Sequence, residues 1–591
     1  MDEGGGGPVG SHKDVGRPRS DRIGVGCRPV DGPHVLTTQH FTCSETEHES
    51  NRKVGFLARF LAASLAVMAS LASAADQARP DVKGGIPHLR KQGTATQLIV
   101  QGEPFIILGG ELHNSSASSL AYMEPIWAKL AAMNLNTVLA TVSWELLEPE
   151  EGKFDFTLVD GLIEGAGKHK RRLVFLWFGS WKNGVSSYVP GWVKTDVKRF
   201  PRVQRRDGAK GEVLTPLGDA NCEADAKAFA ALMRHIRQMD GREQTVVMVQ
   251  VENEVGLLGD ARDRSPLAEK AFAQPVPAEL LDYLAKHKDS LIPEFRQYWE
   301  ATDFKSSGTW SEVFGDGADE TFMAWHYARY IGKIVADGKA QHPLPMFVNA
   351  WLIQREGQKP GAYPSGGPVS KMIDVWRAGG PAIDLFAPDI YLSDFQGVCA
   401  SYTRSGNPLF IPEAGRGPDA AAKALVAIGQ FDAIGFCPFG IDSMSAENPL
   451  KDTYQMLADL MPAMAQAQGS GKMIVLADQG EGNRTIDLAG YRLEVSPGGG
   501  GRGGSDGSPA IVIASGAEEF LVAGAGLGIH FSARTRGPRQ TGILAIDEGR
   551  FQEGKWVPGR RMNGDENAGG WKLQLPGGAP SIQRIRLYQY D

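Results

Sequence analysis

Two short apolar runs in the sequence end directly in carboxylates. Thr245–Val251 leads into Glu252–Glu254, and Pro408–Pro412 leads into Glu413. If both runs are barrel strands, these acids lie at the carboxyl ends, where the active sites of such folds are built. They could instead be structural acids that cap helices or pair with arginine. One acid from each of two distant strands is also what glycoside hydrolysis requires, since one protonates the leaving oxygen and the other attacks the sugar or activates water.

Glu252 and Glu254 share the same strand parity, so the residue pattern alone allows either to face the barrel interior. Glu254 lies nearer the carboxyl end of its run and therefore nearer a cleft. Glu252 lies deeper, and we expect it to be a buried, hydrogen-bonded structural acid. Position along the strand therefore favours Glu254 as the reacting group.

Aromatic side chains gather at or just beyond the expected strand ends. Sugar-binding clefts stack such rings against the apolar faces of a pyranose. One tryptophan alone would more often be core packing, but the group favours a carbohydrate site. Its members are Trp144, Trp177, Trp181, Trp192, Trp351 and Tyr391.

Composition and motifs exclude several other functions. The formal net charge of −7 gives no basic surface for nucleic acid. The histidines show neither HExxH nor paired ligand spacing, so we expect no metal site. No GxSxG elbow stands between an expected strand and helix, and the five cysteines form no CxxC pair. An enzyme without metal or cofactor is expected.

Over residues 97–467, short runs of β-branched or aromatic residues alternate with helical stretches. The strands and helices that must position the acids are expected in this region. This alternation predicts βα units, and about eight strands predict an α/β fold, a (β/α)8 TIM barrel. A doubly wound sheet would need a nucleotide fingerprint after its first strand, and Leu108–Glu111 supplies none. The mixed stretch 260–319 predicts an elaborated loop that shapes substrate access. The Gly-rich, strand-like region 468–591 predicts a small all-β sandwich.

The amino-terminal region carries the pattern of a secretory signal. Basic residues precede the apolar run Phe60–Leu71, which closes on Ala72–Ala74. A transmembrane anchor would need about 20 apolar residues, and this run is shorter. We therefore expect a signal peptide over 54–74 and an exported protein, periplasmic or secreted, without membrane insertion after cleavage.

The signal should begin at the start of translation, yet 53 residues precede it. We therefore expect 1–53 to be a non-functional extension upstream of the true start. Between the signal and the barrel, 75–96 is expected to be a linker.

Three segments of the sequence, taken together, match a known arrangement of motifs. They are Val249–Glu254 with the Val-Gly that follows, Asn136–Phe156, and Gly109–His113. They resemble the acid/base, second-strand and first-strand segments of glycoside hydrolase family 35, whose members are mostly β-galactosidases. The resemblance covers about Gln97 to Gly440. The carboxyl-terminal region, with Glu553–Gly559, resembles the sandwich of a bacterial branch of that family.

The resemblance implies a retaining enzyme with Glu254 as acid/base, Glu413 as nucleophile and Asn253 on the sugar 2-hydroxyl. Where typical members carry Cys-Ala-Glu-Trp this chain has Phe178–Gly184, and Asn114 replaces an aromatic residue. The resemblance therefore predicts the type of reaction more firmly than it predicts which sugar is bound. The expected substrate contacts are Asn253, Tyr391, Trp144, Glu111, His113, Trp181, Asn183, Trp310 and Trp351.

We therefore expect a retaining exo-β-galactosidase acting on galactose-containing oligosaccharides, with xyloglucan side chains suggested by the bacterial branch. Two alternatives stay open: another β-glycosidase, such as a β-glucosidase or β-mannosidase, and a carbohydrate-binding protein that has lost turnover. The binding-only alternative predicts a missing carboxylate at 254 or 413, and both are present. A homo-oligomer is left open.

Overall fold

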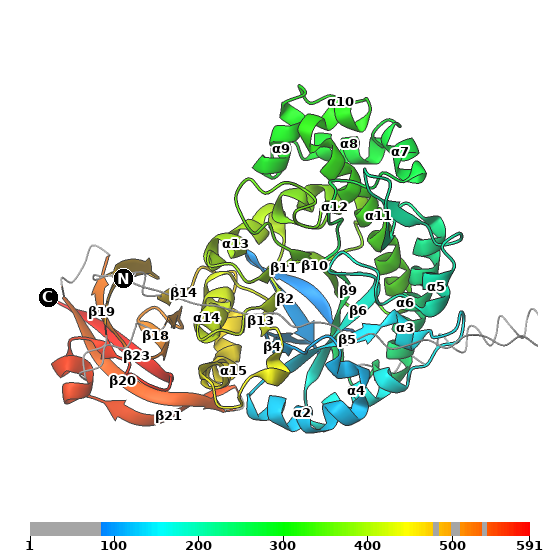
Figure 1. Cartoon of the computed structure of the whole chain (residues 1–591). Helices are drawn as coiled ribbons and strands as arrows, with labels where there is room; N and C mark the ends of the chain where they lie inside the picture. The colour runs from blue at the N-terminus through cyan, green and yellow to red at the C-terminus, as the bar shows by residue number, and fades with distance from the viewer. Residues whose placement is uncertain (1–83, 477–483, 498–508, 535–539, 553) are drawn as a thin grey trace, which may run out of the picture. The chain divides into compact units, whose positions relative to one another are not determined.

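The computed structural model describes residues 84–476, 484–497, 509–534, 540–552 and 554–591. Eight parallel strands form a closed barrel in the order β10-β11-β12-β13-β4-β5-β6-β9 (Figure 1). Their bounds are β4 (Ile107–Glu111), β5 (Thr137–Ser143), β6 (Arg172–Lys182), β9 (Val246–Asn253), β10 (Met346–Trp351), β11 (Leu385–Ile390), β12 (Ile411–Ala414) and β13 (Gly435–Pro438). The expected (β/α)8 barrel is confirmed.

The barrel strands are buried on both faces, which explains why they appear in the sequence as continuous apolar runs. Side chains of one parity, such as Leu139, Leu176 and Phe347, fill the barrel interior. Those of the other parity, such as Val138 and Phe175, pack outward into the main core. The interior is therefore packed solid, and only the strand ends are free to build a site.

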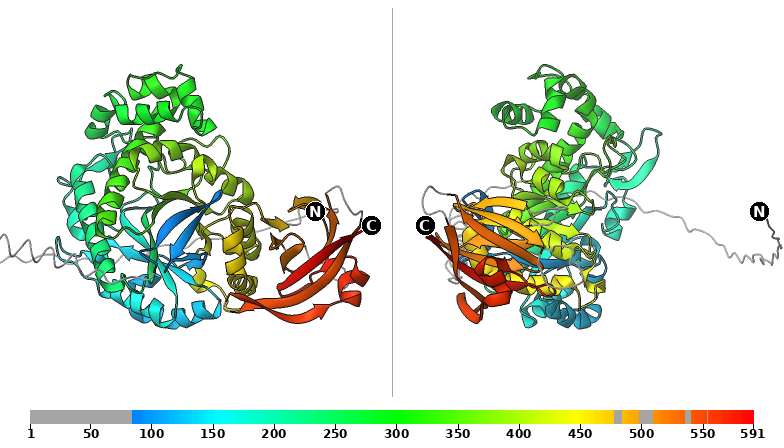
Figure 2. Two further views of the ribbon diagram at one scale, coloured as in Figure 1. Left: turned by 180° about the vertical axis from the view of Figure 1, so that it is seen from behind. Right: turned by 90° about the vertical axis from the view of Figure 1, so that its left-hand side faces the viewer.

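Helices surround the barrel in Figures 1 and 2. Long helices such as α6 and α11 pack against each other and against the strands, because their buried faces are rich in alanine and large apolar residues. The surrounding helices are α2 (Leu120–Ala132), α3 (Trp144–Leu147), α4 (Thr157–Lys168), α5 (Gly191–Thr195), α6 (Asp219–Asp240), α11 (Ala318–Gln341), α12 (Ile373–Gly379), α13 (Phe395–Tyr402), α14 (Ala420–Gln430) and α15 (Pro449–Ala467).

The stretch 260–319, which we expected to be an elaborated loop, is helical instead (Figure 1, top). It contains α7 (Pro266–Phe272), α8 (Ala278–Lys286), α9 (Pro293–Glu300) and α10 (Trp310–Phe314). Local signals explain the difference. Prolines begin α7 and α9, the Ser265 side chain caps α7, and Thr309 and Glu312 form a capping box on α10.

The prediction that residues 75–96 form a linker is wrong for the part of this segment that the structure describes, from residue 84 onward. Strands β1 (His88–Gln92), β2 (Ala95–Val100) and β3 (Glu103–Phe105) form an antiparallel sheet. Leu98 and Val100 of β2 join the core inside the barrel. The burial of these apolar side chains holds the segment in place, so regular structure begins before residue 97.

A separate two-stranded sheet joins β7 (Arg202–Gln204) and β8 (Lys210–Leu214).

The carboxyl-terminal region is all-β, as expected. One sheet has six strands in the order β14-β17-β18-β23-β20-β21, and a second has four in the order β15-β16-β19-β22. Residues of both sheets, including Val522 and Ile529, share one core, so the sheets pack as a sandwich. The strands are β14 (Met473–Leu476), β15 (Arg484–Leu488), β16 (Tyr491–Pro497), β17 (Ala510–Ala514), β18 (Glu519–Gly524), β19 (Leu527–Ala533), β20 (Gln540–Gln552), β21 (Lys555–Met562), β22 (Leu573–Gln574) and β23 (Ser581–Tyr590).

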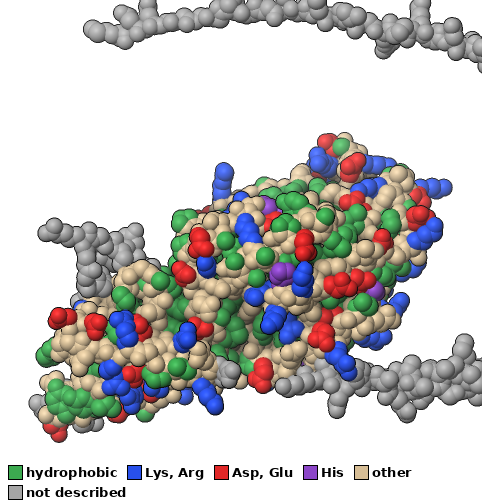
Figure 3. Space-filling model, turned by 90° about the horizontal axis from the view of Figure 1, so that it is seen from below, with side chains coloured by type: hydrophobic (Ala, Val, Ile, Leu, Met, Phe, Trp, Pro, Cys, Tyr) green, Lys and Arg blue, Asp and Glu red, His purple; other side chains and the backbone are tan. Residues whose placement is uncertain are grey.

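The predicted extension 1–53 and signal peptide 54–74 lie outside the described residues. Within the part of the chain that is described, no helix has the length and apolarity that crossing a membrane requires. Figure 3 shows lysine and arginine side chains interspersed with acidic ones on the face seen from below. That face therefore presents no extended field of one sign.

Candidate active site

The two acids singled out by the sequence stand at the same mouth of the barrel. Glu254 directly follows β9, and Glu413 lies on β12 beside Asp389 of β11. Each carboxylate residue is only 6% exposed. The negative charge of Glu413 raises the pKa of Glu254, so the two side chains are close enough to interact electrostatically. The fold thus brings together acids 159 positions apart in the sequence.

Glu254 sits in a strained and desolvated position. Its backbone adopts the left-handed region with φ 45°, where non-glycine residues are uncommon. The backbone N–H of Glu254 donates to Asn349 Oδ1 of β10 at 2.9 Å, which holds the turn. Burial, followed by the charge of Glu413, raises the pKa of Glu254 to about 7. A carboxyl group with this pKa is suited to give and take a proton near neutral pH.

Asn349 and Asp389 extend this hydrogen-bond chain across the barrel mouth. Asn349 Nδ2 donates to Asp389 Oδ2 at 2.7 Å. Burial and the neighbouring charges of Glu413 and Glu254 raise the pKa of Asp389 well above its ordinary value. A side-chain hydrogen bond between Asp389 and Glu254 also raises the pKa of Asp389 and lowers that of Glu254.

Tyr391 holds the other catalytic candidate. Its hydroxyl donates to Glu413 Oε1 at 2.5 Å from a position just beyond β11. Tyr391 as a residue is 52% exposed, so it stands at the open mouth rather than in the core. Glu413 Oε2 has no partner among the described residues. One oxygen of Glu413 is thus held by Tyr391, and the other is buried without a hydrogen-bond partner in the described structure.

Lys182 places a buried cation in this group of acids. Its ammonium donates to Asn253 Oδ1 at 2.9 Å, and Asn253 Nδ2 is left without a partner in the described structure. Lys182 also lies over the Phe178 ring at 5.1 Å. Its positive charge lowers the pKa of Glu254, in opposition to burial. Lys182 therefore orients the Asn253 amide, whose N–H groups have no acceptor among the described residues.

Glu111, at the end of β4, is 1% exposed, yet neither carboxylate oxygen has a hydrogen-bond partner among the described residues. Burial, the charge of Glu413 and that of Glu254 raise its pKa well above the ordinary value, although Lys182 acts in the opposite direction. A buried carboxyl without partners is costly unless something else satisfies it. Glu111 can bond the hydroxyl groups of a ligand.

Glu252 is the structural acid that its depth predicted. It is fully buried, and its carboxylate accepts from the backbone N–H groups of Ser180 at 3.1 Å and Trp181 at 2.7 Å. The Ser180 N–H and hydroxyl also donate to Asp225 of α6. The two acids thus fix the end of β6 immediately before Lys182.

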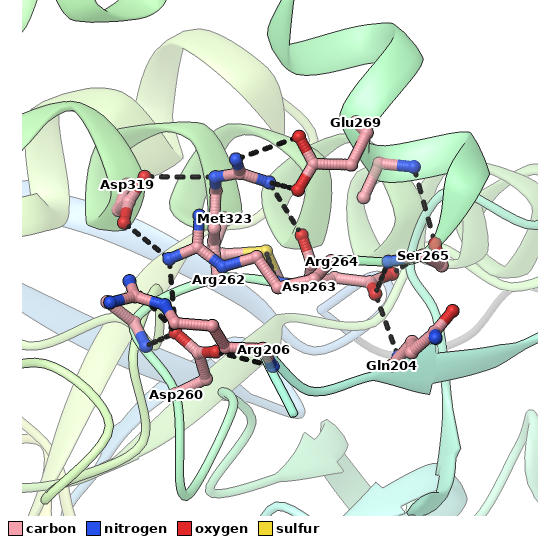
Figure 4. Close-up of polar contacts among 12 residues, drawn as sticks. Gln204, Arg206, Asp260, Arg262, Asp263, Arg264, Ser265, Glu269, Asp319 and Met323 are labelled. Carbon is pink, nitrogen blue, oxygen red and sulfur yellow. Dashed lines mark hydrogen bonds and ion pairs between the residues drawn. The ribbon is translucent and has the colours of Figure 1, made fainter. Parts of the chain in front are cut away.

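A network of charges anchors the chain after Glu254 (Figure 4). Arg262 binds Glu269 of α7 through two bonds of 3.0 Å and Asp319 of α11 through one. Arg264 binds Asp260 at 3.1 Å and Asp319 at 2.8 Å. Because Arg262 is 5% exposed, its charge is paired rather than screened by water. The network ties the loop beyond the acid to two helices.

Three other predicted contacts lie at or near the mouth. His113 Nε2 pairs with Ser443 Oγ at 2.7 Å, and the ring remains partly exposed. Asn183, with φ 52°, leaves its Oδ1 buried and without a partner in the described residues. Trp351 ends β10 beside Asp389 and is half-buried. Their contact with substrate stays a prediction.

Three other tryptophans that we expected to contact the substrate are core residues, so the prediction of a substrate contact is wrong for each of them. Trp144 is fully buried, bonded to Glu148 and edge-on to Trp192. Trp181 is fully buried against Tyr327 and Tyr330. Trp310 is 1% exposed and packs in the helical insertion. Their apolar faces are covered by protein, which leaves no surface for a sugar ring.

Sequence reasoning missed Lys182, Asn349 and Asp389. The last two carried a usable signal, because each is a polar residue inside an otherwise apolar strand, as Glu252 is. Lys182 carried none, since a lysine near a strand end is ordinarily a solvated side chain. Within the described residues, no group of three or more His, Cys, Asp or Glu side chains could hold a metal ion.

The fold and site define a class: a (β/α)8 protein with paired acids at its strand ends, one of raised pKa, as in two-carboxylate glycosidases. Comparisons with known proteins agree with this class. Residues 121–315 match the model of glycoside hydrolase family 42, described as Beta-galactosidase. Residues 450–574 match a domain of unknown function, DUF5597. The resemblance to family 35 stays a prediction, because the matching family model is that of family 42.

Two curated relatives are similar over part of the chain. Beta-galactosidase of Xanthomonas manihotis is 29% identical over 29% of this chain and 27% of its own length. Human Beta-galactosidase-1-like protein 3 is 30% identical over 31% of this chain and 26% of its own length. The chain thus spans about a quarter of the relatives it matches. Among solved structures, a β-galactosidase from Bacillus circulans sp. alkalophilus aligns with a TM-score of 0.41 and 16% identity, over 60% of this chain and 56% of that chain.

Proposed function

We propose that the protein is a retaining exo-β-galactosidase that removes terminal β-galactosyl units from oligosaccharides. The observation that carries the proposal is the pair of buried acids: Glu254 with a pKa near 7 and Glu413 held by Tyr391. The matches to β-galactosidases support the choice of sugar. Family 35 remains the finer assignment we favour, on the motif Val249–Glu254.

In the first step, Glu413 Oε2 attacks the anomeric carbon while Glu254 donates its proton to the leaving oxygen. Tyr391 keeps the other oxygen of Glu413 in place. In the second step, Glu254 as a base removes a proton from water, which attacks the glycosyl ester of Glu413. We propose a carboxyl separation of about 5 to 5.5 Å, the value for retaining enzymes. Asn253 binds the sugar 2-hydroxyl.

The test is release of nitrophenol from a panel of β-glycosides, followed by variants. Galactose should be preferred, and an equal or greater rate on a β-glucoside or β-mannoside would contradict the choice of sugar. Glu254→Ala should lose about 10² to 10⁴ in rate on poor leaving groups and regain turnover of activated substrates with azide. Glu413→Ala with azide should give the product of inverted configuration. Glu279→Ala, at the exposed start of α8, is the matched control. Wild-type rates in both active-site variants would refute the mechanism.

We also propose that the protein is exported, on the pattern of residues 54–74. Amino-terminal sequencing of the mature protein should find a start just after Ala74, and a mature chain that retains residues 54–74 would refute this.

A further inference from the structure

A pocket of about 480 Å³ lies beside the candidate active site, at the carboxyl end of β5. The loop after β4, the ends of β5 and the helices α3 and α4 form its walls. The volume falls in the range of small-molecule sites. None of the catalytic candidates lines it, so it is separate from the site described above.

The pocket adjoins the barrel mouth. Thr141 and Ser143 share strand parity with Leu139, which packs inside the barrel and pairs with Glu111. On the other side, Ser143 pairs with Phe178, the ring beneath the Lys182 ammonium. Tyr188, which lines the pocket, lies edge-on to Phe178 at 5.0 Å. A ligand in the pocket would therefore be one strand away from both Glu111 and Lys182.

Hydrogen-bonding groups in the pocket lack partners. Thr141 and Ser143 are each only 8% exposed, and within the described residues their hydroxyls make no hydrogen bond. The buried Oδ1 of Asn114 is also without a partner among them. A buried polar atom such as Asn114 Oδ1 is ordinarily satisfied in a native protein. Together with two hydroxyls that line the same cavity without partners, it indicates a polar ligand.

The chemistry of the lining restricts what that ligand is. Asn114 Oδ1 is an acceptor without a partner, and the hydroxyls of Thr141 and Ser143 can donate and accept, so the lining fits a ligand rich in hydroxyl groups. Glu145 is paired with Lys194 at 3.0 Å, and the negative charge of Asp155 disfavours phosphates and sugar acids. Leu146, Leu158 and further apolar side chains supply a surface for carbon-bound hydrogens. A neutral pyranose has both properties.

We propose that this pocket is a second sugar subsite, which binds a neutral pyranose joined to the unit held at the catalytic carboxylates. This inference rests on the proposed function. The second sugar is the first unit of the leaving group, because an enzyme that removes terminal galactosyl units holds no sugar on the non-reducing side of the scissile unit. In this position the sugar presents its hydroxyl groups to Thr141, Ser143 and Asn114.

The experiment compares kcat/KM on three substrates: a nitrophenyl β-galactoside, a galactosyl-glucose disaccharide, and a nitrophenyl glycoside of a galactose disaccharide. The double variant Thr141→Val/Ser143→Ala removes the two hydroxyls with little change in shape. With release of the terminal galactose as the readout, kcat/KM should fall about tenfold or more on both extended substrates, whose leaving groups begin with a sugar. On the single-sugar substrate, kcat/KM should stay within about twofold of the wild-type value. Thr403→Val, at the exposed end of α13, is the matched control.

Ala117→Leu, which fills the pocket from its wall, should have the same selective effect. Equal changes on all substrates, or none, would overturn the subsite while leaving the proposed function standing. If the wild-type protein cleaves no substrate, the proposed function fails, and saturation-transfer NMR with galactosyl-glucose then decides about the pocket. Saturation of the second ring that disappears in Ala117→Leu supports the subsite, and its absence in the wild type refutes it.

Discussion

Glu254→Gln should increase the free energy of unfolding of the protein at neutral pH and have little effect at acidic pH. The structure raises the pKa of Glu254 from an ordinary 4.5 to about 7, chiefly by burial. A carboxyl whose folded pKa is raised is at its most favourable below the unfolded pKa, and stability is lost as the pH rises through the folded value. The variant carries a neutral amide of the same shape, so it avoids this cost.

At 1.36 kcal/mol per pKa unit, the rise of the Glu254 pKa from 4.5 to about 7 corresponds to about 3 kcal/mol. The cost develops between about pH 4.5 and 7 and is constant above that window. Urea unfolding at pH 4, 6 and 8 measures it: the variant and the wild type should be nearly equal at pH 4 and differ by about 3 kcal/mol at pH 8. Glu279→Gln, at an exposed position of α8, should show no such trend. A difference that does not change with pH would refute the assignment of a buried, proton-holding Glu254.

Further predictions concern the reaction itself. In the wild type, kcat/KM should fall as the pH rises through about 7, because Glu254 must be protonated to act as the acid, and a basic limb far above pH 8 would contradict this. Tyr391→Phe should lower kcat/KM about tenfold through the lost bond to Glu413, and a wild-type rate would remove the hydroxyl from the mechanism. Lys182→Met should move the basic limb upward by roughly one pH unit, because the lysine charge lowers the pKa of Glu254. An unmoved limb together with an unchanged KM would show that Lys182 acts on neither Glu254 nor Asn253.

The barrel and its two principal acids were predictable from the sequence, because both depend on local patterns. Strands buried on two faces are continuous apolar runs, and a carboxylate at the end of such a run, as at Glu254 and Glu413, has few structural explanations. The depth of Glu252 was also predictable, since strand parity and position set it. These features need no knowledge of which segments meet.

Only the tertiary structure decided the surroundings of each side chain. The sequence predicts that a sugar ring stacks on Trp144, Trp181 and Trp310. In the structure, side chains from other segments, such as Trp192 on Trp144 and Tyr327 on Trp181, cover their rings. Burial of an aromatic ring is a property of what packs on it, which strand-end position alone does not reveal.

The same reason explains the pKa of Glu254 and the role of Lys182. The pKa is the sum of desolvation by the whole barrel mouth and of charges on β6 and β12, and no single segment contains these. Lys182 becomes a site residue because β6 lies next to β9, within reach of Asn253. The sequence by itself therefore determined which acids could react, and the tertiary structure decided their protonation, because electrostatic interactions depend on distances between side chains that are remote along the chain.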